Sequence, residues 1–367
     1  MTTTECQYFN LLQSALWNTP VSLEGEIDWN GVMKIARHQA NDVLISSVAI
    51  QMSGNNMPPD DMRIKMNELM RTNLIRYLQL KQVLLPAVEL LRQHDIEPVL
   101  LKGFGLAMLY PNPTLRQFGD IDLYIGQSKF HEACALLRTL PGGYHWCMES
   151  DVGRHYNIDF GPHPLEIHRV SADVHGKDGN RYASIEKDGL EDAVRQVDFE
   201  GYTLSLPSFE FQVFFTFFHA WHHFLNSGVG WRQISDVATT LHAYHGRLDL
   251  DKLRDWLNAM HLMQPWQAFG YLMVEQLGLP QEEMPFYTSR CRRMALRLYR
   301  RIMEEGNFKR RSNFKRRKPK EAGLKRKLHG FIGIFVDFFY RAQVFPAAAF
   351  REMNSSLARI FGKFFKK

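Results

Sequence analysis

The chain contains few cysteines, and their spacing suits neither a zinc site nor a disulfide framework. Its 367 residues include Cys6, Cys134, Cys147 and Cys291, which are widely scattered and form no Cys-x-x-Cys pair. Scattered thiols are typical of a reducing compartment. The N-terminus also lacks a basic region followed by an apolar run, so we expect no secretory signal and a cytoplasmic protein.

Long apolar runs are also scarce. The most apolar stretch, residues 331–350, is interrupted by Asp337 and Arg341, whereas a membrane span needs about 20 mostly apolar residues. We therefore expect this stretch to be a core helix or an amphipathic helix lying on another surface. Hydrophobic residues make up 45% of the chain and aromatic residues 13%, which is enough for a substantial globular core of one large domain or two.

The most informative feature that is present is a pair of aspartates in residues 119–125, Gly-Asp-Ile-Asp-Leu-Tyr-Ile. The alternating apolar residues predict a β-strand. Asp120 and Asp122 would then share one face, with Cβ atoms about 6–7 Å apart. Two neighbouring carboxylates are typical of a site for a hard divalent cation such as Mg²⁺. The alternative is a pair of solvated surface charges at the end of a strand.

Upstream of this pair, residues 94–105 have the pattern of a short buried strand that runs into a glycine turn and then a short helix. Lys102, Gly103 and Gly105 occupy the turn. Glycine lets the backbone approach a ligand closely, and the start of a helix presents free N–H groups and a partial positive charge. The segment is therefore a candidate phosphate seat, and the alternative is an ordinary strand-to-helix turn.

Downstream of the pair, residues 154–160 and 165–170 alternate like the two strands of a hairpin, with residues 161–164 as the turn. Glu166 lies on the second strand. It would supply a third carboxylate if that strand lies beside the strand of Asp120 and Asp122. The alternatives for Glu166 are an outward-facing glutamate, or a partner of Arg169 or His168.

Together these motifs resemble an uncharacterised bacterial nucleotidyltransferase family of the DNA polymerase β-like superfamily. The resemblance covers residues 25–310 and rests on Lys102-Gly103, Tyr110-Pro111-x-Pro113, Arg116-x-x-Gly119-Asp120-x-Asp122-Leu123, Leu165-Glu166-Ile167-His168, His219, Gly230-Trp231-Arg232-Gln233-Ile234-Ser235-Asp236 and Glu304-Glu305-Gly306-Asn307-Phe308. It implies an α+β fold, in which a polymerase β-like nucleotidyltransferase core, a small mixed sheet with flanking helices, is embedded in a mostly helical chain.

The resemblance also implies an activity and a set of site residues. A nucleotidyltransferase of this kind is an ATP-binding or other nucleoside-triphosphate-binding enzyme that moves an NMP to an acceptor hydroxyl and releases pyrophosphate. The implied catalytic and metal-binding residues, which would hold Mg²⁺ or Mn²⁺, are Asp120, Asp122 and Glu166. The implied nucleotide-binding residues are Lys102, Gly103, Gly105, Arg116, His219 and Arg232. Glu166 acting as a general base is the alternative to its role as a metal ligand.

Three details accompany the resemblance. The superfamily usually grips the nucleotide with a Gly-Ser pair, whereas this chain has Lys102 and Gly103, which puts the choice of nucleotide in doubt. Arg232 is expected to meet a phosphate with two hydrogen bonds, but its spacing also allows an i,i+4 pair with Asp236. His219 and His223 share a helical face, yet no His-Glu-x-x-His pattern accompanies them, so a zinc peptidase is not indicated.

The patterning divides the chain into four parts. We expect a helical N-terminal region at 1–93, which includes helices at 29–52 and 62–91 and packs on the sheet, and a catalytic core at 94–206. A helical C-terminal domain at 207–305 precedes a basic segment and amphipathic C-terminal helices at 306–367. A helix is expected at 128–138 with Ser128 as its N-cap, an exposed loop at 173–188, and a short strand at 202–206.

Charge is concentrated near the C-terminus. Residues 306–327 carry eleven Lys and Arg residues and one Glu, in a chain of net charge +6. Such a cluster attracts polyanions and is screened by salt. Its three candidate roles are binding nucleic acid, holding the protein peripherally at the anionic inner face of a membrane, and serving only as a solvated linker.

Two further functions compete with small-molecule nucleotidyl transfer. One is a non-catalytic nucleotide- or polyanion-binding protein with the same fold, and the other is a toxin-like enzyme that modifies RNA or protein. The first is disfavoured because clustered carboxylates repel one another and are of no use to an inactive protein. The acceptor, the preferred base and the oligomeric state do not follow from the sequence.

Overall fold

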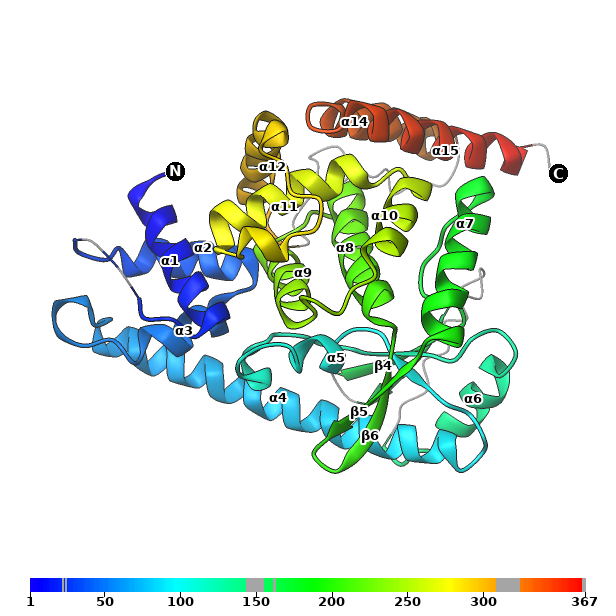
Figure 1. Cartoon of the computed structure of the whole chain (residues 1–367), viewed down its shortest axis with the longest axis horizontal. Helices are drawn as coiled ribbons and strands as arrows, with labels where there is room; N and C mark the ends of the chain where they lie inside the picture. Colours follow the sequence, from blue (N-terminus) through cyan, green and yellow to red (C-terminus); the bar gives the residue numbers. More distant parts are fainter. Residues whose placement is uncertain (22, 24, 143–154, 161–162, 308–323, 365–367) are drawn as a thin grey trace.

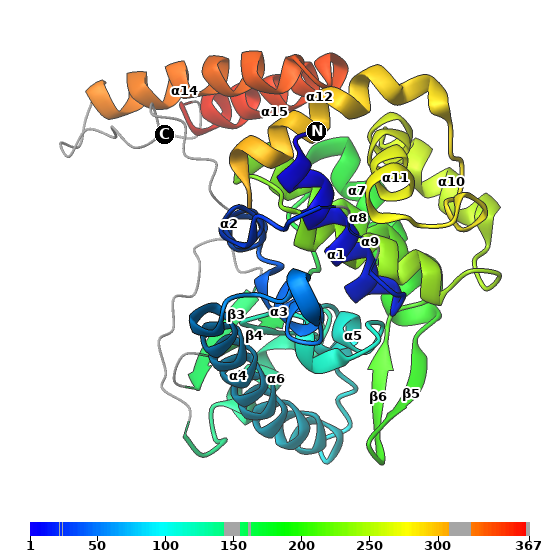
Figure 2. The same cartoon turned by 90° about the vertical axis from the view of Figure 1, so that its left-hand side faces the viewer.

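The computed structural model describes the chain except for residues 22, 24, 143–154, 161–162, 308–323 and 365–367. A small sheet lies at one end of the molecule, covered on one face by the long helix α4 (Asp60–Arg92) and by α6 (Phe130–Leu137). A body of helices lies over the other face, and the C-terminal helices run along the opposite edge (Figures 1 and 2).

The sheet has six strands, in the order β3-β4-β2-β1-β6-β5. They are β1 (Val99–Leu100), β2 (Ile121–Tyr124), β3 (His155–Phe160), β4 (His163–His168), β5 (Arg195–Phe199) and β6 (Tyr202–Leu206). The pairs β2–β4 and β1–β6 are parallel, and the other three are antiparallel. The expected small mixed sheet inside a mostly helical chain is therefore confirmed, as are the hairpin that carries Glu166 and the strand at 202–206.

The N-terminal helices divide between the two sides of the molecule. The first three are α1 (Thr3–Trp17), α2 (Trp29–Gln39) and α3 (Asp42–Ala49). Their apolar side chains join those of the helical body in one hydrophobic cluster, whereas α4 packs against the sheet in a second cluster. The expected packing of this region on the sheet thus holds for α4 and not for α1–α3. The four-part division of the chain stays a prediction.

The remaining helices form the body and its edges. They are α5 (Phe104–Ala107), α7 (Gly176–Lys187), α8 (Phe209–Asn226), α9 (Trp231–Ala243), α10 (Leu250–Ala259), α11 (Met263–Leu277), α12 (Arg292–Glu305), α14 (Leu324–Ala342) and α15 (Pro346–Phe364). Short helical turns are η1 (Gly54–Asn56), η2 (Pro113–Leu115), η3 (Asp188–Asp192), η4 (Gln281–Glu283) and η5 (Ser289–Cys291). The phenylalanine-rich α8, capped by the Ser208 side chain, is the centre of the body's core.

Three local expectations were wrong. The segment at 173–188 is not an exposed loop, because α7 forms there and buries Tyr182, Ile185 and Glu186 on one face. These three residues are at positions i, i+3 and i+4, so they share one face of a helix. Polar residues and glycines dominate the rest of the segment, which is why it was expected to be a loop. Strand β5 was not expected at all. Finally, α6 begins at Phe130 with Lys129 rather than Ser128 at the capping position.

The stretch at 331–350 forms the end of α14 and the start of α15 rather than one helix. No helix in the described part of the chain is both long enough and apolar enough to cross a membrane. Most of the basic segment at 306–327, namely residues 308–323, lies outside the described residues, so its three candidate roles stay predictions.

Candidate active site

Asp122 and Glu166 lie side by side on the face of the sheet that looks toward the helical body. On β2, Ile121 and Leu123 pack in the cluster beneath α4, so Asp122 between them points to the opposite face. Strand β4 pairs in parallel with β2, and Asp122 is directly opposite Glu166 in that register. The structure therefore places Glu166 beside one of the two aspartates, as the pattern of alternation suggested.

His168 completes a compact group with these two carboxylates. It follows Glu166 by two residues on β4, so both side chains share a face. Its Nε2 lies 2.9 Å from Asp122 Oδ1 and 3.5 Å from Glu166 Oε2. Asp122, Glu166 and His168 each offer a ligand atom within 4.8 Å of the others. The pKa of His168 is raised, because its hydrogen bonds to Asp122 and Glu166 outweigh its burial.

Lys102 reaches the same aspartate from the end of β1. Its Nζ lies 2.9 Å from Asp122 Oδ1. The pKa of Asp122 is lowered: burial alone would raise it, but the charges of Lys102 and His168 outweigh burial. The second carboxylate oxygen, Asp122 Oδ2, is buried without a hydrogen-bond partner among the described residues. Such an orphaned charged oxygen is costly, and a bound cation would relieve it.

Asp120 occupies a different position from Asp122. It precedes β2, is only partly buried and lines a cavity, and it does not belong to the compact group of Asp122, Glu166 and His168. Its pKa is raised, first by burial and then by the negative charge of Asp122. The two aspartates of the motif are thus distinguished by their surroundings, because Asp122 is buried beside Lys102 and His168 and Asp120 lies on the cavity wall.

The two glycines of the turn have different roles. Gly103 has a φ of +60°, and a Cβ there would come within 2.9 Å of Asp120 O, so the turn requires glycine. Gly105 packs with its Cα against Leu206 and Leu100, and its amide donates to Lys102 O. The Gly105 amide is thus engaged within the turn, and its expected contact with phosphate stays a prediction.

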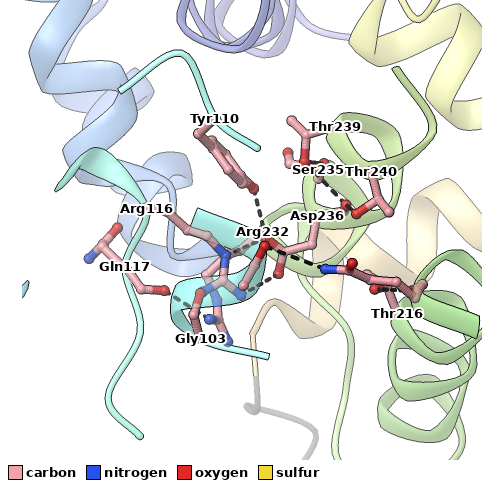
Figure 3. A network of polar contacts seen from close by, with 12 residues as sticks. Gly103, Tyr110, Arg116, Gln117, Thr216, Arg232, Ser235, Asp236, Thr239 and Thr240 are labelled. Atoms are coloured by element: carbon pink, nitrogen blue, oxygen red, sulfur yellow. Dashed lines mark hydrogen bonds and ion pairs between the residues drawn. The ribbon is translucent and has the colours of Figure 1, made fainter. Parts of the chain in front are cut away.

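Arg116 is held in a buried clamp (Figure 3). Its Nε and Nη2 donate to Asp236 Oδ1 and Oδ2 at 2.6 and 2.9 Å, and its Nη1 donates to Gly103 O at 3.1 Å. Tyr110 donates its hydroxyl to Asp236 as well, at 2.8 Å. Each of the three guanidinium nitrogens thus donates a hydrogen bond within the protein. Arg116 therefore positions the Lys102–Gly103 turn, and its expected role as a phosphate ligand is not supported by this geometry.

Most of the expected nucleotide-binding residues line one cavity of about 440 Å³, which lies between the turn, residues 116–120 and helices α8 and α9. Its lining comprises Lys102, Gly103, Leu106, Arg116, Phe118, Gly119, Asp120, Thr216, His219, His223, Arg232, Gln233 and Asp236. Three of these side chains are basic. Asp120 and Asp236 are acidic, and Asp236 pairs with Arg116, so Lys102 and Arg232 are the candidate phosphate ligands of this cavity, which lies next to the sheet carboxylates.

Arg232 and Asp236 on the cavity wall do not form the i,i+4 pair that their spacing allowed. Asp236 pairs with Arg116 rather than with Arg232, and Arg232 donates to Gln117 O at 2.9 Å (Figure 3). His219 and His223 face each other, with their Nε2 atoms 2.9 Å apart. Burial, followed by the charge of Lys102, lowers the pKa of His219 well below its usual value, so its imidazole is neutral at neutral pH.

Two parts of this site were not foreseen. His168 was part of the Leu165–His168 motif and a possible partner for Glu166 but not a candidate site residue, although the two-residue spacing on a strand already places both on one face. The clamp of Arg116 with Asp236 joins residues that are 120 positions apart, and no local pattern signals that pairing. Thr216 and Gln233 also line the cavity, although neither was a candidate site residue.

Fold and site together define an α+β nucleotidyl-transfer protein: carboxylates on adjacent strands, a lysine-glycine turn and a basic cavity between sheet and helices. The chain belongs to the uncharacterised nucleotidyltransferase family, whose family model matches residues 25–278, more than half of the chain. This assignment makes it a transferase of nucleotidyl groups. No curated protein and no solved structure matches the chain. The Glu304–Asn307 stretch included in the expected resemblance lies beyond the matched residues.

Proposed function

We propose that the protein is a divalent-metal-dependent enzyme that transfers an NMP from a nucleoside triphosphate to an acceptor hydroxyl. The observation that carries this proposal is the pair of Asp122 and Glu166, adjacent across β2 and β4, with one buried Asp122 oxygen lacking a hydrogen-bond partner among the described residues. Together with the family assignment, this arrangement favours a catalytic protein over a merely binding one.

The donor set suits a divalent cation. Asp122 and Glu166 provide the hard oxygen ligands that Mg²⁺ and Mn²⁺ prefer. Lys102 Nζ lies 2.9 Å from Asp122 Oδ1 and leaves Asp122 Oδ2 as the oxygen that an ion would bind. A bound ion would supply Lewis-acid stabilisation of charge on the transferring phosphoryl group.

The chain's own residues divide the remaining work. Lys102 and Arg232 on the cavity wall would bind the triphosphate, and the clamp of Arg116 with Asp236 keeps the lysine turn in place. The acceptor oxygen would form a bond to the α-phosphorus as the bond to the β-phosphate bridging oxygen breaks, and pyrophosphate leaves. Asp120 would take the acceptor's proton, because it lies on the cavity wall and its pKa is raised by burial and by Asp122.

The test is a screen of the four α-labelled nucleoside triphosphates with the purified protein, a cell lysate and Mg²⁺ or Mn²⁺. We expect label to move to one acceptor and pyrophosphate to appear in equal amount. Label on RNA or protein would identify the toxin-like alternative, and label on a small molecule would exclude it. Failure of every nucleotide to yield pyrophosphate would contradict the proposal.

A matched pair of variants sharpens the screen. Asp122→Asn removes the charge at the proposed metal site, and Asp198→Asn makes the same change at an exposed position of β5 on the same sheet. Transfer should be lost in the first variant and unchanged in the second. Equal activity in the two variants would show that the sheet carboxylate has no part in the reaction.

A further inference from the structure

In the described part of helix α14 the two charged side chains are buried, whereas four apolar side chains are exposed. Among the described side chains of this helix, those at 332–342, the exposed ones are Ile332, Phe335, Val336 and Phe339, and the buried ones are Asp337 and Arg341. The exposed fraction reaches 41% for Ile332 and 66% for Phe339. This is the reverse of the arrangement expected for a helix on a water-facing surface.

We name the four exposed residues Ile332, Phe335, Val336 and Phe339 the α14 face. Their spacing of i, i+3, i+4 and i+7 places them in one stripe along the helix. A contiguous apolar stripe marks an interaction surface more often than scattered apolar residues do. The catalytic proposal does not use this stripe, because α14 and the sheet lie at opposite ends of the molecule (Figures 1 and 2).

The orientation of the helix is fixed by its buried side. Arg341 lies 3.7 Å from Asp337 within the helix and donates through its Nε to Leu225 O on α8 at 2.8 Å. Immediately after the helix, Phe345 packs edge-on against Trp221 and Phe224 of α8. Rotating α14 to bury its apolar stripe would break these contacts and expose Phe345. The outward direction of the α14 face therefore follows from packing.

Basic side chains lie alongside this face. Helix α12 contacts the end of α14, since Arg301 lies over the Tyr340 ring at 4.1 Å and Arg297 donates to Gln343 O at 3.4 Å. Arg293, Arg297 and Arg300 on α12 are exposed. An apolar helical stripe next to cations is the combination that binds an anionic lipid surface.

We propose that the α14 face docks on an anionic lipid bilayer, with its apolar side chains in the headgroup–acyl boundary and the α12 arginines near lipid phosphates. Both views place α14 and α15 along one outer edge of the molecule (Figures 1 and 2). Docking there would leave the cavity between the sheet and α8 at a distance from the bilayer. The proposal stands independently of the catalytic one, because no residue is shared between them.

The experiment is flotation of the full chain with vesicles of phosphatidylcholine alone and with vesicles that also contain phosphatidylserine. We expect flotation with the anionic vesicles only, and release at high salt. Val336→Glu with Phe339→Glu should weaken binding about tenfold or more, because charged groups enter the apolar boundary. Arg293→Gln and Arg300→Gln should each weaken it about fivefold.

The matched control is Leu74→Glu with Leu78→Glu on α4, where two apolar side chains on a helix are 41% and 47% exposed. This variant should float like the unchanged protein. Circular dichroism would verify that both double variants fold, and Phe339→Ser replaces the α14 variant if that one does not.

Three outcomes would overturn the proposal. They are absence of flotation with anionic vesicles, equal flotation of the α14 and α4 variants, and a dimer that dissociates in the α14 variant without any vesicle binding. The last result would assign the α14 face to a second copy of the chain.

Discussion

Two buried charged clusters lie on either side of the lysine-glycine turn, and they are built in opposite ways. In the clamp, Arg116, Asp236 and Tyr110 satisfy one another, and Arg116 also holds Gly103 O. In the sheet cluster, Asp122 holds Lys102 and His168 through a single oxygen, while the other oxygen has no hydrogen-bond partner among the described residues.

The difference separates a structural cluster from a reactive one. A satisfied ion pair fixes geometry and has no capacity left for a ligand. A cluster with an orphaned carboxylate oxygen is costly in the folded state and is characteristic of a site that binds something. Removing Asp236 should therefore damage stability, and removing Asp122 should damage activity. The following predictions test that contrast, beginning with the largest expected effect.

Asp122→Asn should lower turnover at least about a thousandfold, or roughly 4 kcal/mol of transition-state stabilisation. Its stability should fall less than that of Asp236→Ala, because Asp120 and Glu166 still offset the charge of Lys102. Pyrophosphate release and urea unfolding measure the two quantities. Full turnover in the folded variant would remove Asp122 from the mechanism.

Asp236→Ala should lower the free energy of unfolding by about 3 kcal/mol, because it leaves the Arg116 guanidinium buried without its counter-charge. Urea unfolding measures this loss, and the exposed Asp198→Ala serves as the control, with an expected change within about 0.5 kcal/mol. Equal effects of the two substitutions would mean that the clamp contributes nothing to stability.

Replacing both members of the ion pair should cost less than the sum of the single replacements. Asp236→Leu together with Arg116→Met leaves no unpaired buried charge, and we expect a coupling of about 2 kcal/mol between the two sites. A thermodynamic cycle built from four unfolding curves measures it. Simple additivity would show that the two side chains do not act as a pair.

Stability should also depend on pH through the helical histidines. Burial lowers the pKa of His223 to about 3, from an ordinary value of 6.5. As pH falls below 6.5, His223 binds a proton in the unfolded chain but not in the folded chain. The free energy of unfolding therefore decreases with falling pH until about pH 3. Between pH 6.5 and about pH 5 the loss is about 1–2 kcal/mol.

Urea unfolding of the unchanged protein and of His223→Gln across that range tests this effect. The variant should show a flatter pH dependence by the stated amount, with His219 still contributing its own share. Parallel curves for the two proteins would mean that His223 is protonated as readily in the folded state as in the unfolded chain.

Strand periodicity was the part of the sequence that predicted the site best. The alternation in residues 119–125 and 165–170 assigned Asp122 and Glu166 to two strands, and the pairing of those strands, which the sequence left open, brings them together. Local patterns could not assign Asp236 to Arg116 instead of Arg232, because that choice depends on how α9 docks against the turn. Helix α7 was not predicted, because only a few of its residues are apolar.

The distinction between Gly103 and Gly105 also required the structure. Both glycines occupy a turn suited to phosphate, yet one is needed for a left-handed backbone near Asp120 and the other for close packing against β6. The sequence shows a glycine at each position. The tertiary contacts show which neighbouring atoms leave no room for a side chain there.

The most direct test of the central claim is a calorimetric titration of the folded protein with Mn²⁺, in the unchanged chain and in Asp122→Asn, Asp198→Asn and Asp236→Asn. We predict saturable binding that Asp122→Asn abolishes and that Asp198→Asn leaves unaltered, with Asp236→Asn retaining it at a temperature where that variant is folded. Binding of equal affinity in the chain that lacks the Asp122 carboxylate would contradict the account.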